Sequence, residues 1–255
     1  MCLALFALES HPLFALVIAA NRDEFHARPA APAAWWDQGW LAGRDMRAGG
    51  AWFGVTREAR WAFVTNVRDT SRNDPEAPSR GALVPAVLDD ALPPSDSLER
   101  VVARASACNG FNLVAGTGPD ACWGSNRGGI ARTLTPGIYG LSNAALDTPW
   151  PKVERTKAAL AAWCGRDDPA LAPLFAMLGD RTVALDHELP ATGISLDRER
   201  LLSPTFIVSE TYGTRCSTVL TLGRDGGAHF VERTFDVRGN SLGEVEHRFA
   251  VPHAR

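Results

Sequence analysis

The stretch MCLALFALESHPLFALVIAANRDEF, residues 1–25, decides how the fold of this chain is interpreted. It contains two short runs rich in Leu, Ala, Val and Ile, residues 3–8 and 13–20, on either side of a polar, proline-bearing bend. Continuous apolar runs of this length are typical of strands that are buried on both faces. We therefore expect a buried antiparallel hairpin at the start of the fold.

The register of this hairpin brings the two unusual features of the stretch together. If residue 8 faces about residue 14, Cys2 lies beside Ala20. The polar run at residues 21–23 then projects just past the start of the chain, at the same end of the hairpin as Cys2. The register predicts a site made from the cysteine and this run.

Composition describes an ordinary globular protein. The chain has 255 residues, of which 45% are hydrophobic and 22% charged, and its formal net charge is -3. This charge, with no basic cluster, excludes a typical nucleic-acid binder. We expect one domain, residues 1–255. The sequence does not indicate an oligomeric state.

Cysteine usage and the N-terminus indicate the compartment. The five cysteines lie at long, irregular intervals, without the spacing of a zinc site, so no metal is expected. Such a set is typical of reduced thiols in the cytoplasm. The N-terminus lacks a positive segment, and no apolar run reaches the length of a membrane span. A cytoplasmic protein is therefore expected. Its cysteines are Cys2, Cys108, Cys122, Cys164 and Cys216.

The remaining pattern favours an α+β or layered α/β/β/α architecture. Strand candidates come in antiparallel-looking pairs, and helices are expected within 81–107, with Ser95 or Asp96 as a cap, from Pro151 onward and within 171–178. Residues 27–50, rich in Ala, Pro and Gly, are expected to form an ordered loop that covers part of the molecule. A long hairpin is expected over 205–237. Nucleotide-binding and metalloprotease motifs are absent, so no cofactor is required.

Cys2 offers a specific chemistry. If Met1 is removed, Cys2 carries a thiol and a free α-amine, and the amine titrates near 7.7–8.0, as a general base at neutral pH requires. Arg22 would favour the thiolate, and Asp23 would hold the ammonium group. This is the arrangement of an N-terminal nucleophile. The alternative is that Cys2 is a small apolar residue and that Arg22 and Asp23 form a solvated ion pair.

Five segments resemble the NRDE-motif family, also called the transport and Golgi organisation protein 2 family. They occur in the family's order over nearly the whole chain and are NRDEF, AGGAWFGV, FVTNVRD, YGLSNAALDTPWPKV and ETYGTRCSTVL. That family is similar to N-terminal nucleophile hydrolases of the choloylglycine hydrolase and penicillin V acylase type. The resemblance implies a four-layer αββα sandwich.

The resemblance also implies the residues of a catalytic site. Hydrolases of this type begin with Met-Cys and place an Arg and an Asp at the end of the second strand, matched here by Cys2, Arg22 and Asp23. Two asparagines at strand ends correspond to Asn66 and Asn143. As side-chain amides they are suited to donate hydrogen bonds to the oxyanion of a tetrahedral intermediate.

A substrate-binding role is less well defined by the sequence. An arginine near the following helix completes the family's set, and Arg155 is the best match. Trp52, with Trp35, Trp36 and Trp40, could wall an apolar acyl pocket or anchor a loop. Arg215, in the YGTR segment, could contact substrate or brace a sheet.

Two functions follow from this resemblance. One is a cysteine-dependent amidohydrolase that cleaves a non-peptide amide through a thioester on Cys2. The other is a carrier of haem, or of an acyl-CoA or lipid, in the same pocket, because family members have been linked to haem trafficking and lipid metabolism. In both, the partner is a small apolar or acyl-bearing ligand, and Arg22 or Arg215 would pair with its carboxylates.

Overall fold

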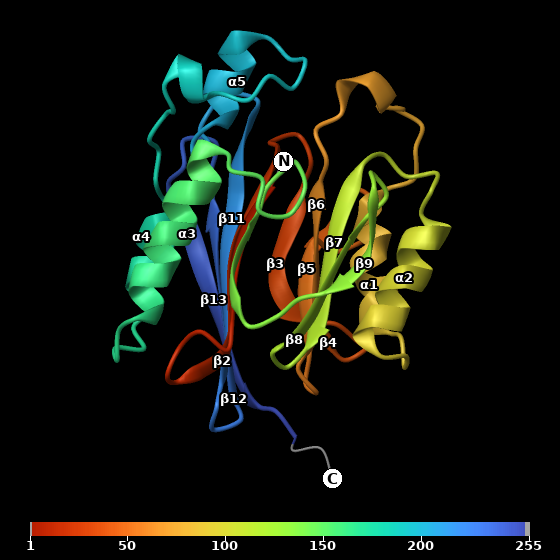
Figure 1. Ribbon diagram of the computed structural model, residues 1–255, viewed down its shortest axis with the longest axis vertical. Helices are drawn as coiled ribbons and strands as arrows, with labels where there is room; N and C mark the ends of the chain where they lie inside the picture. Colours follow the sequence, from red (N-terminus) through yellow and green to blue (C-terminus); the bar gives the residue numbers. More distant parts are fainter. Residues whose placement is uncertain (1, 253–255) are drawn as a thin grey trace.

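Two antiparallel sheets lie face to face between two layers of helices (Figure 1). The computed structural model describes residues 2–252. The first sheet has the order β10-β1-β2-β11-β12-β13, and the second runs from β3 to β9 in chain order. The α+β fold and its four αββα layers, as predicted from the sequence, are confirmed.

The strands of the first sheet come from both ends of the chain. They are β1 (Cys2–Leu8), β2 (Phe14–Phe25), β10 (Gly137–Leu141), β11 (Tyr212–Gly223), β12 (Gly227–Phe235) and β13 (Ser241–Ala250). Those of the second sheet are consecutive: β3 (Ala30–Trp35), β4 (Trp40–Asp45), β5 (Phe53–Thr56), β6 (Arg60–Asn66), β7 (Phe111–Thr117), β8 (Asp120–Ser125) and β9 (Gly129–Thr133).

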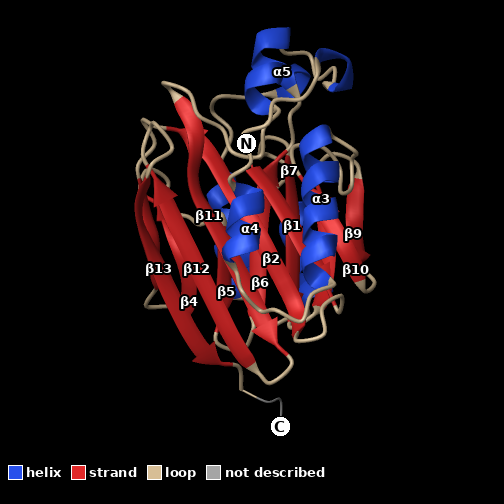
Figure 2. Ribbon diagram, turned by 90° about the vertical axis from the view of Figure 1, so that its left-hand side faces the viewer, coloured by secondary structure: helices blue, strands red, loops and turns tan. Residues whose placement is uncertain are grey.

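Helices cover the outer face of each sheet. The second sheet packs against α1 (Leu83–Leu88) and α2 (Pro94–Arg104). The first sheet packs against α3 (Pro151–Cys164) and α4 (Ala172–Leu178), while β12 and β13 extend beyond these two helices (Figure 2). The helix α5 (Leu196–Leu202) lies past one end of the first sheet (Figure 1). Short 3-10 turns occupy Thr70–Arg72, Arg80–Ala82 and Asp186–Glu188.

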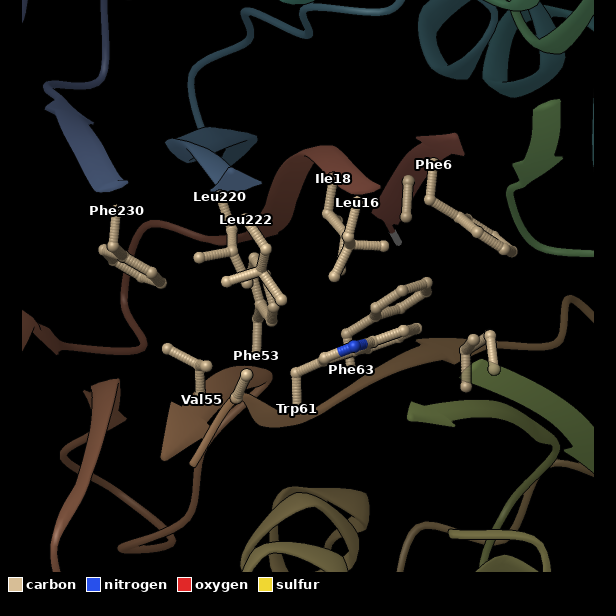
Figure 3. Close-up of a cluster of buried hydrophobic side chains, with 14 of the residues drawn as sticks. Phe6, Leu16, Ile18, Phe53, Val55, Trp61, Phe63, Leu220, Leu222 and Phe230 are labelled. Atoms are coloured by element: carbon tan, nitrogen blue, oxygen red, sulfur yellow. The ribbon is translucent and has the colours of Figure 1, made fainter. Parts of the chain in front are cut away.

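The core between the sheets is aromatic and aliphatic (Figure 3). Phe6 of β1 points into it and meets Phe63 of β6 with ring centroids 5.7 Å apart. Leu5, the neighbour of Phe6, points the other way and packs under the helices. This alternation explains the continuous apolar run in the sequence, because both faces of β1 are buried.

Several sequence predictions of secondary structure were wrong. Residues 27–50 contain the strands β3 and β4 instead of a loop, and β9, β13 and α5 were not foreseen. β3 is an edge strand, which tolerates Pro32 because one side of the strand needs no ladder hydrogen bonds. The helix α2 begins at Pro94 rather than behind a cap at Ser95 or Asp96.

No helix within residues 2–252 is both long enough and apolar enough to cross a membrane.

Candidate active site

The β1–β2 hairpin places Cys2 directly opposite Arg22. The prediction that Cys2 lies beside Ala20 was therefore wrong by two residues, because the bend between the strands is longer than expected and Leu8 pairs with Leu16. The strand β2 also continues through the polar run, since β11 pairs with it on the other side, up to Tyr212 opposite Phe25. A shift of two preserves the face of every side chain, so the predicted meeting of the cysteine with the polar run still occurs.

A cavity of about 70 Å³ opens beside Cys2, between the two sheets. The residues that line it include five that the sequence singled out: Cys2, Arg22, Asp23, Trp52 and Asn66. They come from β1, β2, the segment before β5 and the end of β6, so four separate parts of the chain meet here.

Arg22 is 95% buried, and neighbouring side chains hold its guanidinium group from more than one direction. Its guanidinium carbon lies 4.5 Å from the centre of the Trp52 ring, and one terminal nitrogen lies 3.5 Å from the Asp45 carboxylate. The other terminal nitrogen, Nη1, is buried and has no hydrogen-bond partner within residues 2–252. Because such a group is costly to bury unsatisfied, Arg22 is suited to donate a hydrogen bond to a molecule in this cavity.

The backbone before β5 makes room for Trp52. A Cβ atom on Gly43 of β4 would come within 2.3 Å of the Trp52 ring, so only glycine lets the indole lie flat against β4. The ring in turn supports the guanidinium of Arg22. Trp52 therefore shapes the cavity wall by positioning Arg22.

Burial controls the ionisation of Cys2. Desolvation raises the pKa of the Cys2 thiol above its ordinary value, and the nearby Asp23 charge acts in the same direction. Arg22 and a backbone hydrogen bond involving Asp23 lower this pKa, but by less. The expectation that Arg22 favours the thiolate holds for its own effect, whereas burial decides the net direction.

Asp23 points away from the space between the sheets, toward the helix layer. Its Oδ1 accepts a hydrogen bond of 2.7 Å from the Thr214 hydroxyl, and its backbone oxygen accepts one of 3.0 Å from the Tyr212 hydroxyl. Burial raises the pKa of Asp23, while the positive charges of Lys152 and Arg22 and the bond from Thr214 lower it. The carboxylate is therefore held rigidly behind Cys2.

A β-bulge at Arg215 interrupts the pairing of β11 with β2 next to Arg22 and Asp23. The pairing of β11 with β2 jumps from Thr214 opposite Asp23 to Cys216 opposite Arg22, which leaves Arg215 as the extra residue. Its Nη1 donates hydrogen bonds of 3.1–3.3 Å to the carbonyl oxygens of residues 25, 26 and 28. Arg215 braces the chain after β2 and is not among the residues that line the cavity.

The two predicted asparagines are neighbours, but only one lines the cavity. Asn66 ends β6 at the cavity wall. Asn143 is buried behind it and donates a hydrogen bond of 2.8 Å from its side-chain nitrogen to the Asn66 carbonyl oxygen. Since one N–H of Asn143 is committed to the backbone, Asn66 is the better placed of the two as a donor to a substrate.

Arg155 lies outside the site. It is on α3, one-third exposed, and donates a hydrogen bond to the Thr182 carbonyl oxygen while facing the Asp180 carboxylate at 3.5 Å. The position of Arg155 therefore gives no support to its assignment as the family's helix arginine.

Several charged residues near Cys2 were missed by sequence reasoning. Arg28, Asp45 and Arg80 line the cavity, and Arg28 donates to Asp45 at 2.5 Å. Lys152, at the start of α3, is buried on the Asp23 side. A signal for Lys152 existed, because it lies in the family-like segment YGLSNAALDTPWPKV. Arg28 and Asp45 lie in residues 27–50, which were interpreted as a loop, and no periodic pattern marks the direction of the Arg80 side chain.

Among residues 2–252, no group of three or more His, Cys, Asp or Glu side chains is arranged so that it could hold a metal ion.

The fold resembles that of a known hydrolase. The crystal structure of the C2A mutant of conjugated bile acid hydrolase from Clostridium perfringens matches with a TM-score of 0.55 over 98% of each chain, at 8% sequence identity. The likeness establishes an N-terminal nucleophile hydrolase type of fold.

Relatives by sequence are closer. The chain is 35% identical over 257 residues to a Transport and Golgi organization protein 2 homolog of Bos taurus, covering 92% of this chain and 93% of that protein. It is 32% identical over 267 residues to the homolog of Homo sapiens, with the same coverage. The family model described as Transport and Golgi organisation 2 matches residues 1–237. The chain therefore belongs to the Transport and Golgi organisation 2 family.

Proposed function

We propose that this protein is an N-terminal cysteine hydrolase that cleaves a linear, non-peptide amide through a thioester on Cys2. The observation that supports it most is the meeting of Cys2, Arg22, Asp23 and Asn66 at one cavity. The bile acid hydrolase of similar fold was solved as its C2A mutant, so a cysteine stands second in that chain as it does in this one.

The first step requires a base. Once Met1 is removed, the α-amine of Cys2 takes the proton of its own thiol, and the sulfur attacks the carbonyl carbon of the amide. The carbonyl oxygen becomes an oxyanion, which Asn66 and the free Nη1 of Arg22 would stabilise by hydrogen bonds. The C–N bond then breaks, and the ammonium group returns the proton to the leaving amine.

The second step restores the enzyme. The amine of Cys2 takes a proton from water, the resulting hydroxide attacks the thioester carbon, and the C–S bond breaks. A carboxylic acid leaves, and the sulfur recovers a proton from the ammonium group. Asp23 would hold that ammonium group throughout, because its carboxylate lies behind Cys2 on the same hairpin end.

The size of the cavity limits what it would hold. Sites for small molecules usually measure about 300–1,000 Å³, whereas this cavity measures about 70 Å³. It has room for the reacting amide group, and the rest of the substrate would lie outside. The same comparison gives no support to the alternative of a haem or acyl-CoA carrier in this pocket.

The test begins with the mass of the purified native protein, before and after brief treatment with iodoacetamide. We expect loss of Met1 and a single rapid alkylation at Cys2, while the buried Cys108 reacts slowly. Cys108→Ala is the matched control, because it removes a thiol outside the cavity.

The same variants are then assayed against a panel of N-acyl amides. We expect turnover in the native protein and in Cys108→Ala, and none above background in Cys2→Ala. Retained Met1 with an unreactive Cys2, or full turnover in Cys2→Ala, would overturn the mechanism.

A further inference from the structure

The outer face of the first sheet is only partly covered by helices. The helices α3 and α4 pack on β10, β1, β2 and β11, whereas β12 and β13 extend beyond them (Figure 2). The end of α4 and the turn between β12 and β13 both line a cavity of about 320 Å³ on this face. Sites for small molecules usually measure about 300–1,000 Å³. This cavity is therefore large enough for a whole small ligand, and it shares no lining residue with the cavity at Cys2.

Three phenylalanines form the apolar wall of this outer cavity. They are Phe175 of α4, Phe206 before β11 and Phe235 at the end of β12. The rings of Phe206 and Phe235 meet edge to face, with their centroids 4.8 Å apart. A Cβ atom on Gly239, in the turn after β12, would lie 2.8 Å from both the Phe206 ring and the Arg181 guanidinium group. The turn thus packs closely against the wall, and contacts within the chain fix the shape of the cavity.

Two arginines supply the charge of the wall. The guanidinium carbon of Arg181 lies 5.0 Å from the centre of the Phe206 ring, and that of Arg233 lies 3.9 Å from the centre of the Phe175 ring. Each cation is thus held against a ring of the wall. No Asp or Glu lines the cavity in the part of the chain that the structure describes. The cavity is therefore positively charged, in a chain whose formal net charge is -3.

Arg181 is the less neutralised of the two arginines. Arg233 pairs with Glu244 of β13 at 2.5 Å. Arg181 forms no ion pair within residues 2–252, and Asp180, its acidic neighbour in the chain, faces Arg155 instead. One terminal nitrogen of Arg181 donates a hydrogen bond of 3.2 Å to a backbone oxygen of the turn, and the guanidinium group has further N–H donors. Arg181 therefore offers both charge and donors to an anion in the cavity.

We propose that this cavity is a binding site, separate from Cys2, for a small aromatic acid. The carboxylate or phosphate group of the ligand binds Arg181, because a guanidinium group matches either anion with paired N–H donors. The ring of the ligand lies against the phenylalanines, which favour a flat apolar body over a simple inorganic ion. Binding here requires no reaction at Cys2, so this site stands apart from the proposed function.

The first test is a fluorescence titration of the native protein with 1-naphthoate, 1-naphthyl phosphate and the neutral 1-naphthalenemethanol. We expect saturable binding of at least one acid, with one molecule per chain. The alcohol should bind about tenfold more weakly, because it lacks the charged hydrogen bonds. The acid that binds more tightly identifies the anion that the site takes. Equal binding of all three compounds, or no saturable binding of either acid up to about 10 mM, would overturn the proposal.

NMR then locates the bound acid in protein labelled with ¹³C in its phenylalanine rings. We expect the tighter acid to shift the signals of Phe206 and Phe235, while those of Phe53 and Phe63, enclosed between the sheets, stay in place. Shifts confined to rings outside the outer cavity would refute the site. This measurement needs no turnover, so a failure of the proposed hydrolase leaves its result intact.

Variants test the cation and the space separately. Arg181→Gln removes the charge, so the acid should bind about tenfold more weakly and the alcohol as before. Arg238→Gln is the matched control, because Arg238 is exposed in the same turn and does not line the cavity. Ser241→Trp fills the cavity without removing a charge, and it covers the case in which Arg181→Gln does not fold.

We expect Ser241→Trp to abolish binding of the acid, because Ser241 lines the cavity. An acid affinity that is unchanged in Arg181→Gln, or lowered equally in Arg238→Gln, would contradict the role of Arg181. Full affinity in Ser241→Trp would show that the acid binds elsewhere and would overturn the proposal.

Discussion

The two faces of β2 at its polar end behave very differently. On the inner face, Arg22 meets Cys2 and Trp52 beside a cavity, and one of its donors has no partner within residues 2–252. On the outer face, Asn21 and Asp23 are enclosed by the helix layer and bonded to groups of β11 and the loops.

This difference follows from the period of a strand. Successive side chains point to opposite faces, so four adjacent polar residues are divided between two environments. The inner face keeps an unsatisfied donor of Arg22 beside the cavity, and the outer face is bonded to β11 and the helix layer. The contiguous motif is thus divided between two environments.

Removing the inner cation is expected to have the largest effect. We expect Arg22→Gln to lower kcat/KM on a cleaved amide by about 10²–10³, the usual loss for one oxyanion donor. Cys2 alkylation should also slow, because the charge of Arg22 lowers the pKa of the thiol. Steady-state kinetics and alkylation rates measure both effects, and Arg155→Gln serves as the control arginine outside the site. Equal losses in the two variants would contradict a role for the inner face.

Disrupting the outer face is expected to cost stability. Asn21 donates to the carbonyl oxygens of Leu178 and Thr205 at 2.9 Å and accepts from the Ser217 hydroxyl at 2.6 Å. Asn21→Ala leaves these buried groups unsatisfied, at a cost of about 1–3 kcal/mol in the free energy of unfolding. Urea denaturation measures it, with the exposed Asn240→Ala as control. A change within about 0.5 kcal/mol would show that the outer bonds do not fix the hairpin.

Displacing the Trp52 ring on the inner face, with no charge removed, is expected to lower stability and to change the reactivity of Cys2. In Gly43→Ala the new methyl group overlaps the Trp52 ring, which must shift and carry Arg22 with it. Overpacking of this kind costs about 1–3 kcal/mol, and the alkylation rate of Cys2 should change as well. Gly39→Ala is a useful comparison, because no atom lies within 4 Å of its Cβ position, although its positive φ adds backbone strain. An unaltered Cys2 rate in Gly43→Ala would mean that Trp52 does not position Arg22.

The outer face also carries a pH dependence of stability. The pKa of Lys152 falls from 10.5 to about 8 on folding, so the unfolded chain binds more protons between these values. Stability therefore rises with pH across this window, as the buried ammonium group loses its proton. Relative to Lys152→Met, the native protein should gain stability between about pH 8 and 10.5. Denaturation at several pH values tests this, and a constant difference would contradict it.

Part of the site could be predicted because Cys2 and the polar run lie at the same end of one hairpin of consecutive strands. The apolar runs in residues 1–25 predicted the hairpin, and the hairpin alone brings Cys2 to the polar run. Arg22 and Asp23 were assigned from the hairpin and the chemistry of Cys2, Asn66 through the family resemblance, and Trp52 as one of four tryptophans that could wall a pocket. The structure brings these residues to one cavity. Their catalytic roles stay predictions.

Other parts depend on pairings that a sequence does not display. Asp45 and Arg80 reach Cys2 because the second sheet packs on the first, and their local sequence has no pattern that predicts this. Arg155 and Lys152 are three residues apart on one helix, yet the helix packing buries one and leaves the other partly exposed. Only the direction in which α3 faces the sheet decides between them.

The sequence by itself determined the α+β class, the buried hairpin and the meeting of a cysteine with an Asn-Arg-Asp-Glu run, because apolar periodicity and strand pairing are local properties. The tertiary structure decided the register of Cys2 against Arg22, the small size of the cavity and the burial of Lys152 against the end of α5. Those outcomes depend on contacts between β2, β11 and the helix layer, which lie far apart in the chain and are fixed only when the layers pack.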